Sequence, residues 1–503
     1  MTAPPQLASA LRQRPLGNAP VNASGRFVLY WMTVQRRLAW NLALDHALAL
    51  AKTHNVPVLV LEPLRAAYPH ASRRFHQFVL EGMAENAKRA ADAGLRYYPY
   101  VEPEADAGKG LLAALSDHAV AIVADGYPTF HTPAMLRAAA KQVSCAMVAI
   151  DGCGWLPMQA SEKAPATAYA FRRFLHRVFR DHLDEAPLAE PLRHVDTEHR
   201  AVIPREILGR WPMAPQGLLD CEERALDALP IDHDVGPASM RGGSAVAEAM
   251  LASFVAHDLP GYAERRRDPV EGGTSELSPY LHFGHVGSHQ VVRAVMEAEG
   301  WTRERLATTT KGQRAGWWGM SEGAEAFLDQ VITWRELGHH FAWHRRDHAR
   351  YASLPAWARA SLEAHGSDER EPRYTPKTFE RAETYDEIWN AAQRQLVCEG
   401  RMHNYLRMLW GKKILEWART PQEAARIMVH LNDKYAVDGR DPNSYSGIYW
   451  VLGRHDRPWA PERKVFGVIR YMSSDSTRRK LRLGQYLERY GDHAQSTLFT
   501  EDA

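Results

Sequence analysis

The sequence predicts an α/β domain followed by an all-α domain, and two patterns along the chain indicate this fold class. In the first third, short apolar runs alternate with segments of helical periodicity, which is typical of a parallel sheet covered by helices on both faces. From Ser244 onward the periodicity is helical, and no strand-rich stretch interrupts it. We therefore expect a parallel-sheet domain first and a helical domain after it.

Five strands are predicted in the first third, because each run is short, apolar and rich in β-branched or aromatic residues. Helical segments lie between them, and one of these ends at a glycine stop, Gly94. In chain order the elements are strand Arg26–Trp31, helix Asn41–His54, strand Val56–Leu61, helix Phe75–Gly94, strand Leu95–Val101, helix Leu111–His118, strand Val120–Asp125, helix Pro133–Val143 and strand Ala146–Asp151.

Ligands of such sheets bind at the carboxyl ends of the strands. Residues 32–37, Glu62 and residues 125–129 are therefore candidates for the rim of a pocket, although each of them could equally belong to an ordinary loop. No GxGxxG sequence follows the first strand, so dinucleotide binding is not supported.

The rest of the chain divides where its composition changes. We expect a flexible tail (1–24), the α/β domain (25–160), a proline-rich connector (161–243) and the helical domain (244–495). The helices predicted for the last part are Ser244–His257, Ser288–Ala298, Ala324–His348, Tyr385–Val397, Met402–Trp417 and Pro421–Leu431.

Composition sets limits on location and chemistry. No apolar run reaches the roughly 18 residues of a membrane span, and the first 24 residues lack the apolar stretch of a signal peptide. We therefore expect a cytoplasmic protein with no membrane contact. The four cysteines among the 503 residues have no metal-binding spacing, so free thiols are expected.

Charge is concentrated near the C-terminus. Val451–Tyr490 holds ten Lys and Arg against four Asp and Glu, a local charge of +6, whereas the whole chain carries +2. Aromatic residues lie among these charges. Because phosphates bind cations and bases stack on rings, the segment favours a nucleic-acid partner. The alternative is a solvated charged face.

Two groups of polar residues suggest ligand contacts. Thr274, Ser275 and Ser278 stand beside glycines at a helix start, where they could hold a phosphate or could simply cap the helix. Arg407 and Asp438 could form a bidentate ion pair that polarises a carbonyl edge of a ligand, or a structural salt bridge.

Tryptophan and histidine spacings each have two interpretations. Trp410 and Trp417 lie two turns apart on one predicted helix and Trp389 lies on the preceding one, which fits core packing or electron transfer. The i, i+4 spacing of His340, His344 and His348 can bind zinc. No HExxH occurs and residues 345–347 are charged, so we favour a solvated or phosphate-facing helix and expect no metal.

Five C-terminal motifs resemble the photolyase/cryptochrome family, and within it the class II cyclobutane pyrimidine dimer photolyases. The resemblance covers the chain from about residue 26 to about residue 490. The motifs are TSELSPYLHFG (Thr274–Gly284), WNAAQ (Trp389–Gln393), GRMHNYLRMLWGKKILEW (Gly400–Trp417), LNDKYAVDGRDPNSY (Leu431–Tyr445) and GRHDRPW (Gly453–Trp459).

The resemblance implies an N-terminal Rossmann-like antenna domain and a C-terminal helical domain that binds FAD. It implies that Asn432 faces flavin N5, that the Arg407–Asp438 pair lies at the carbonyl edge of the flavin, and that Trp389, Trp410 and Trp417 transfer electrons to it. The other residues that would hold FAD are Tyr262, Thr274, Ser275, Leu277, Ser278, Trp334, Arg335 and Asn404.

The activity implied is that of a deoxyribodipyrimidine photo-lyase, which repairs dimers in double-stranded DNA by electron transfer from excited FADH⁻ and needs no obligate protein partner. Class II relatives also suggest a deazaflavin antenna, 8-HDF. Gln330 stands where the family generally has a glutamate that bonds the dimer. Residues matching the lesion pocket and DNA-gripping face are Met408, Trp450, Arg454, Arg457, Trp459 and Arg470.

Two rival functions fit the same motifs. A cryptochrome-like light sensor would share the fold and the flavin but repair nothing, and Gln330 is the residue that favours it. A light-independent nucleic-acid binder would use its tryptophans only in the core.

Overall fold

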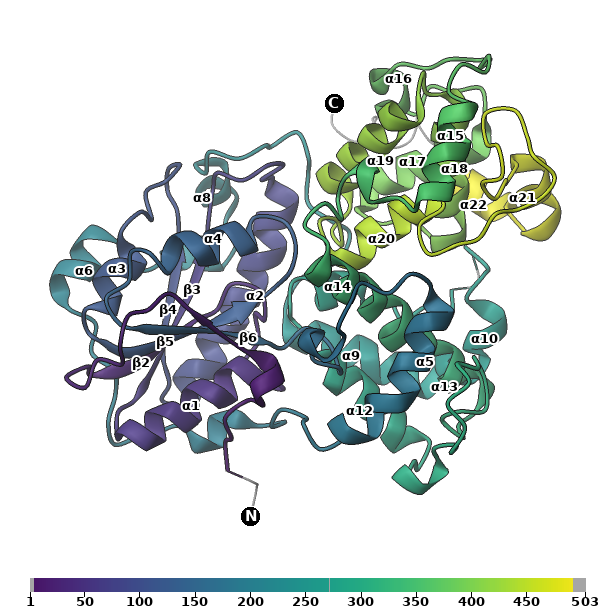
Figure 1. The fold of residues 1–503 in the computed structure, drawn as a ribbon. Helices are drawn as coiled ribbons and strands as arrows, with labels where there is room; N and C mark the ends of the chain where they lie inside the picture. Colours follow the sequence, from purple (N-terminus) through teal and green to yellow (C-terminus); the bar gives the residue numbers. More distant parts are fainter. Residues whose placement is uncertain (1–3, 271, 492–503) are drawn as a thin grey trace. The chain divides into compact units, whose positions relative to one another are not determined.

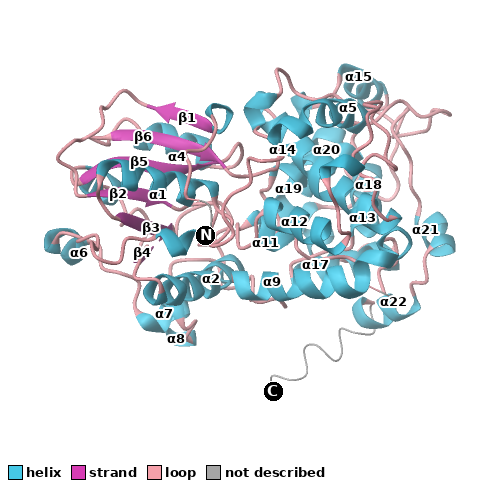
Figure 2. Ribbon diagram, turned by 90° about the horizontal axis from the view of Figure 1, so that it is seen from below, coloured by secondary structure: helices cyan, strands magenta, loops and turns pink. Residues whose placement is uncertain are grey.

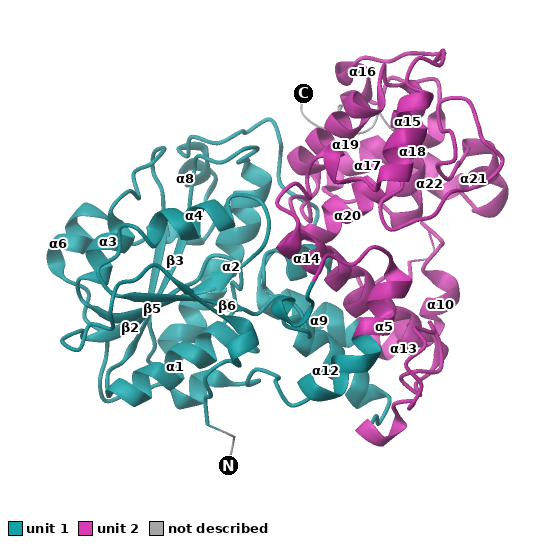
Figure 3. Ribbon diagram, in the orientation of Figure 1, with its two compact units in different colours: residues 1–162, 175–253, 276–301 teal, residues 163–174, 254–275, 302–503 magenta. Residues whose placement is uncertain are grey.

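The computed structural model describes residues 4–270 and 272–491. The chain divides into two compact units that alternate along the sequence (Figure 3). Unit 1 comprises residues 1–162, 175–253 and 276–301, and unit 2 comprises residues 163–174, 254–275 and 302–503. The segments expected from composition follow one another along the chain, whereas part of the connector belongs to each unit. Their boundaries therefore stay a prediction.

Unit 1 is built on a six-stranded sheet with the order β1-β6-β5-β2-β3-β4 (Figures 1 and 2). Every neighbouring pair is parallel except β1 with β6, which confirms the predicted parallel sheet. The strands are β1 (Gln13–Leu16), β2 (Phe27–Trp31), β3 (Val58–Leu64), β4 (Arg96–Val101), β5 (Ala119–Gly126) and β6 (Ala146–Asp151).

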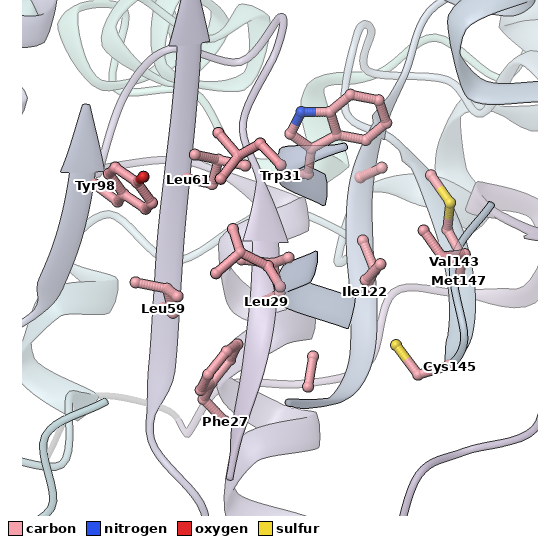
Figure 4. Packing of buried hydrophobic residues seen from close by; sticks show 14 of the residues in the cluster. Phe27, Leu29, Trp31, Leu59, Leu61, Tyr98, Ile122, Val143, Cys145 and Met147 are labelled. Atoms are coloured by element: carbon pink, nitrogen blue, oxygen red, sulfur yellow. The ribbon is translucent and has the colours of Figure 1, made fainter. Parts of the chain in front are cut away.

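Both faces of this sheet are buried, which explains the continuous apolar runs. Along β2, Phe27, Leu29 and Trp31 pack into one core cluster (Figure 4), while Val28 and Tyr30 pack into the cluster on the opposite face. The helices between the predicted strands are α1 (Leu42–His54), α2 (Arg73–Asp92), α3 (Leu111–Ser116) and α4 (Thr132–Ala139).

Strand β1 corrects the expectation of a flexible tail over residues 1–24. Gln13 to Leu16 pair with Ile150 to Met147 at the edge of the sheet, where a proline such as Pro15 is tolerated. The buried Arg12 holds this end of the chain, because its guanidinium donates to the carbonyl oxygens of Asp151 and Gly154 at 3.1 and 3.2 Å. These partners are distant in sequence, so no local pattern indicated the strand.

The rim candidates of the sheet have structural partners within unit 1. One oxygen of Asp125 accepts hydrogen bonds from the backbone N–H groups of residues 33–35 at 2.7 to 2.9 Å, which fixes the loop after β2. Glu62 accepts from Arg36, Asn86 and Tyr97 at 2.7 to 2.9 Å. These carboxylates therefore order the carboxyl edge of the sheet.

Beyond the sheet the secondary structure is helical, as predicted. Helix α5 (Ala168–Val178) runs from unit 2 into unit 1. The remaining α-helices of unit 1 are α6 (Arg205–Arg210), α7 (Gln216–Leu219), α8 (Glu223–Asp227), α9 (Ser244–Ser253), α11 (Ser278–His282) and α12 (Ser288–Ala298).

In unit 2, α18 packs against α17, α19 and α20 (Figure 1). The helix predicted over Ala324–His348 is interrupted by the π-helical segment η8 (Asp329–Trp334). The α-helices are α10 (Tyr262–Arg265), α13 (Glu322–Leu328), α14 (Arg335–His344), α15 (Ala356–Ala364), α16 (Pro376–Glu380), α17 (Glu387–Glu399), α18 (Asn404–Trp417), α19 (Pro421–Tyr435), α20 (Pro442–Val451), α21 (Ser474–Lys480) and α22 (Gly484–Tyr490).

Candidate active site

Helices α18 and α19 bring together the polar side chains that the motifs predicted. Arg407 donates from Nη1 to Oδ1 of Asn432 at 3.1 Å and from Nη2 to Oδ1 of Asp438 at 3.4 Å. The ion pair with Asp438 therefore forms, but a single nitrogen makes it, so it is not bidentate as the first of the two alternatives required. The Arg407 and Asp438 side chains remain 22% and 18% exposed, which leaves this polar edge accessible.

Neighbouring groups fix the orientation of the Asn432 amide. Its Nδ2 donates to Oγ of Ser444 at 2.7 Å and to Oδ1 of Asp433 at 3.2 Å, so its oxygen must point to Arg407. Asp433 also accepts from the hydroxyl of Tyr445 at 2.9 Å. Burial and this carboxylate raise the pKa of Tyr445, which keeps the phenol neutral as a donor.

The three tryptophans lie in succession within unit 2. The indole N–H of Trp389 donates to the backbone oxygen of Trp410 at 3.0 Å, and the ring centroids of Trp389 and Trp417 are 6.0 Å apart. All three are buried. The Trp410 indole N–H donates to Oε1 of Gln393 at 2.8 Å. Core packing and an electron path are therefore both compatible with this arrangement.

A second group of aromatic residues alternates with cations beside α18. We call Trp450, Arg470, Trp459 and Arg457 the Trp–Arg ladder. The Arg470 guanidinium lies 5.7 Å from the ring centroid of Trp450 and 4.3 Å from that of Trp459, and Arg457 lies 4.6 Å from Trp459. Such stacks hold long cationic side chains in fixed positions beside aromatic rings, and nucleic-acid-binding surfaces combine these two kinds of residue.

Comparisons with known proteins decide the family. Residues 28–192 match the family model described as DNA photolyase. The chain is 31% identical over 482 residues to a deoxyribodipyrimidine photo-lyase of Methanothermobacter thermautotrophicus, covering 95% of this chain and 98% of the relative. It is 32% identical to a deoxyribodipyrimidine photo-lyase of Arabidopsis thaliana, covering 92% and 88%. The chain belongs to the photolyase family of enzymes.

A solved structure agrees with this photolyase fold. The bacterial class III photolyase from Agrobacterium tumefaciens matches with a TM-score of 0.66 at 20% identity, covering 93% of this chain and 86% of that one. At that identity the likeness concerns the fold alone. The class II assignment stays a prediction.

One predicted DNA contact of this photolyase-family chain needs correction. Arg454 is only 1% exposed, and its guanidinium lies 4.6 Å from the ring centroid of Phe341 and 4.3 Å from that of Tyr449. It donates to the backbone oxygen of His348 at 2.6 Å and to the hydroxyl of Ser353. Arg454 thus supports the core rather than presenting charge to a polyanion, and burial lowers its pKa to about 9.

Segment η8 carries two of the predicted residues, and a third follows it directly. Gln330 and Trp334 are half-buried, and Arg335 is buried at the start of α14. The segment is held by a bidentate ion pair in which Arg172 donates to both oxygens of Asp329 at 2.6 and 3.0 Å. Because a π-helical turn shifts the side chains relative to a regular helix, Gln330 is directed differently from what an uninterrupted helix would give.

The predicted phosphate-binding residues are distributed over both units. Tyr262, Thr274 and Ser275 belong to unit 2, whereas Leu277 and Ser278 belong to unit 1. Tyr262 is buried, with the Arg266 guanidinium 5.7 Å from its ring centroid. Helix α11 begins at Ser278 without a side-chain cap, so the capping alternative is not supported there.

The other predicted residues lie on α18 or near α14. Asn404 is exposed at the first position of α18, and Met408 is half-buried one turn further on.

Helix α14 ends at His344, so His348 does not continue the histidine row. Within residues 4–270 and 272–491, no three His, Cys, Asp or Glu side chains are grouped to hold a metal ion. No helix in these ranges is long and apolar enough to cross a bilayer.

Sequence reasoning missed two residues that contact the site. Ser444 orients Asn432 from α20, and the buried Lys412 lies with its ammonium 5.5 Å from the ring centroid of Trp450. Both stand inside or next to recognised motifs, but serine and lysine are so common that spacing alone gave no signal. Burial lowers the pKa of Lys412 to about 7.

Proposed function

We propose that this protein repairs cyclobutane pyrimidine dimers in double-stranded DNA under light, with FAD as its cofactor. One observation supports the proposal above the others. Helix α18 carries Arg407 of the polar edge and Trp410 of the tryptophan path, and its Lys412 contacts Trp450 of the Trp–Arg ladder. A cofactor edge, an electron path and a DNA-facing surface are therefore joined by a single rigid element.

The side chains present fit an isoalloxazine ring. A guanidinium and an amide of fixed orientation are suitable partners for its carbonyl and N5 edge, and the partial exposure of Arg407 and Asp438 leaves room for a ligand to approach. When bound and reduced, the light-excited flavin would supply one electron to the dimer and take it back after the ring opens.

Each group of residues has a separate task in this proposal. Arg407 and Asp438 hold the carbonyl edge, and Asn432 bonds N5, where a proton is held or released. Thr274, Ser275 and Ser278, together with Tyr262 and Leu277, bind the phosphates and ribityl chain. Trp334, Arg335 and Asn404 complete the contacts with the cofactor. Trp410, Trp389 and Trp417 deliver electrons that restore the reduced state.

The Trp–Arg ladder is the part of this proposed site that would contact DNA. A dimer inside a duplex cannot reach a buried cofactor, so the damaged nucleotides must be extruded, and a damaged pair costs less to open. Trp450 and Met408 would contact the extruded dimer. Arg457, Trp459 and Arg470 would bind the phosphates and fill the space left in the duplex, with affinity that falls steeply as salt rises.

Repair of thymine dimers tests the proposal directly. Purified protein reconstituted with FAD and reduced is expected to remove dimers from DNA under blue light and to leave them unchanged in the dark. Equal dimer content in both samples would reject repair. An absorption spectrum of the same preparation reports the flavin and any antenna such as 8-HDF. A preparation that stays colourless after reconstitution would instead favour a light-independent nucleic-acid binder.

A second function is favoured by Gln330. An amide can donate and accept hydrogen bonds, but it supplies no carboxylate at the position where the family generally has one. A cryptochrome-like light sensor, or a photolyase with another lesion preference, is therefore the alternative. Protein that photoreduces its flavin yet leaves thymine dimers intact would support it.

A further inference from the structure

The tryptophan path does not reach solvent at its third member. Trp417 is 1% exposed, so an oxidised Trp417 would have no direct contact with a reductant in solution. Tyr385 lies against it, with ring centroids 5.4 Å apart at 61°, and Tyr385 is 65% exposed. The path of aromatic rings therefore continues to the surface through a tyrosine that no motif indicated.

A lysine opposes oxidation of Trp417. The ammonium of Lys413 lies 5.1 Å from the centroid of the Trp417 ring, and its ion pair with Glu416 at 2.9 Å keeps it charged, since this partner helps to raise the pKa of Lys413. A cation over an indole stabilises the neutral ring and destabilises the ring that has lost an electron. A hole on Trp417 is thus driven toward a neighbour that can also lose a proton.

Tyr374 also lies against Trp417, but its environment is less suitable for giving up an electron and a proton. Its ring centroid is also 5.4 Å from that of Trp417, but the ring is half-buried and nearly perpendicular, at 86°. Its phenol oxygen accepts a hydrogen bond of 2.9 Å from the backbone N–H of Tyr385, which withdraws electron density from the phenol. The Tyr385 phenol can release its proton to water at the surface.

We propose that Tyr385 is the terminal electron donor of the path Trp410–Trp389–Trp417, an inference that rests on the proposed flavin function. Trp410 gives one electron to the light-excited flavin, and the hole moves through Trp389 to Trp417. Tyr385 then gives one electron to Trp417 and its phenol proton to water, which leaves a neutral tyrosyl radical. A dissolved thiol returns a hydrogen atom to Tyr385, and two of the resulting thiyl radicals combine as a disulfide.

Electron paramagnetic resonance of the full-length, FAD-loaded protein tests this assignment. The proteins compared are the wild type, Tyr385→Phe and the matched control Tyr374→Phe, each frozen during illumination without thiol. Wild type and Tyr374→Phe are expected to give a tyrosyl signal that narrows when ring-deuterated tyrosine is incorporated, and Tyr385→Phe is expected to lose it. Transient absorption should show a longer-lived tryptophanyl radical in Tyr385→Phe, because the tyrosine that reduces it in the wild type is absent.

The outcomes separate this inference from the function on which it rests. A tyrosyl signal that survives in Tyr385→Phe, or one that disappears in Tyr374→Phe instead, would overturn the role of Tyr385. Wild-type protein that repairs dimers but forms only tryptophanyl radicals would do the same, while leaving the proposed function intact. Protein that binds no flavin would overturn both. Melting temperature and flavin absorbance establish that each variant is folded and loaded.

Discussion

Asn432 accepts a hydrogen bond from Arg407 at 3.1 Å, and this bond links the two motifs that define the polar edge of the site. It connects α18 to α19, while the amide nitrogen of Asn432 is held from α20 by Ser444. An asparagine with both ends bonded has one orientation only, so the group that it offers to a cofactor is fixed before the cofactor binds.

Replacing Asn432 tests that orientation. Asn432→Ala removes three hydrogen bonds in and around a buried side chain, so we expect a loss of about 1–3 kcal/mol in the free energy of unfolding. Ser444→Ala removes only the bond to Nδ2 and should cost less. If Asn432 bonds the flavin, Asn432→Ala also changes flavin photoreduction, measured by absorbance, beyond the effect of Ser444→Ala. Equal photoreduction in both variants would contradict this role.

Replacing Arg454 and replacing Arg470 should have different effects, the first on stability and the second on DNA affinity. Arg454→Ala empties a buried space between two rings, so unfolding should become easier by about 3 kcal/mol. Arg470→Ala removes a half-exposed cation, so it should leave the melting temperature nearly unchanged. In Arg470→Ala the affinity for DNA should fall, and the slope of log affinity against log salt should decrease by about 1. Calorimetry measures the change in stability, and fluorescence anisotropy measures the affinity for DNA. If Arg454→Ala weakened DNA binding and Arg470→Ala lowered the melting temperature, the structural role of Arg454 would be contradicted.

Trp410→Phe tests the electron path. Phenylalanine keeps the packing but is much harder to oxidise, so photoreduction of the flavin should slow strongly. Repair by chemically pre-reduced protein does not need the path and should persist. Gln393→Met is a suitable control, because it removes the hydrogen-bond partner of the Trp410 indole but keeps the ring. Normal photoreduction in Trp410→Phe would remove this tryptophan from the path.

Gln330→Glu tests the unusual amide. If a carboxylate at this position stabilises the dimer during repair, the variant should repair thymine dimers with a higher yield per absorbed photon than the wild type. Gln330→Met is the control for loss of all hydrogen bonding. Equal yields for the wild type and Gln330→Glu would mean that the amide is sufficient.

His365 makes the loop over residues 459–469 sensitive to pH. Its Nε2 bonds Glu462 of this loop at 2.9 Å and its Nδ1 bonds Asp368 at 2.7 Å, and these two partners raise the pKa of His365 above 6.5. A raised histidine pKa gives stability that is fully present below the unfolded value and is lost as pH rises through the folded value.

Hydrogen exchange measures this effect in the loop. Exchange at Val465 and Val468 should be faster at about pH 8.5 than at about pH 6 after correction for the intrinsic rates, because the neutral imidazole holds Glu462 less tightly. His365→Gln should remove most of the difference. A pH dependence that persists in His365→Gln would have to come from another group.

The sequence alone predicted five of the six strands, many of the helices and the resemblance to the photolyase family. Strands such as β2 are buried on both faces, and burial on both faces requires a continuous apolar run that is visible in one dimension. The motifs also suggested the ion pair between Arg407 and Asp438, which the structure contains at 3.4 Å. Strand β1 could not be read, since an edge strand needs no apolar run and its anchor, Arg12, bonds residues far along the chain.

Only the tertiary structure decided which charged and aromatic side chains are buried. Arg454 and Arg470 look alike in a basic segment, but one lies between two rings in the core and the other is half-exposed in the Trp–Arg ladder. In the same way, Trp417 ends the tryptophan path in sequence, whereas packing places Tyr385 between it and solvent. The physical reason is that burial depends on contacts between distant segments, and neither charge nor spacing along the chain specifies those contacts.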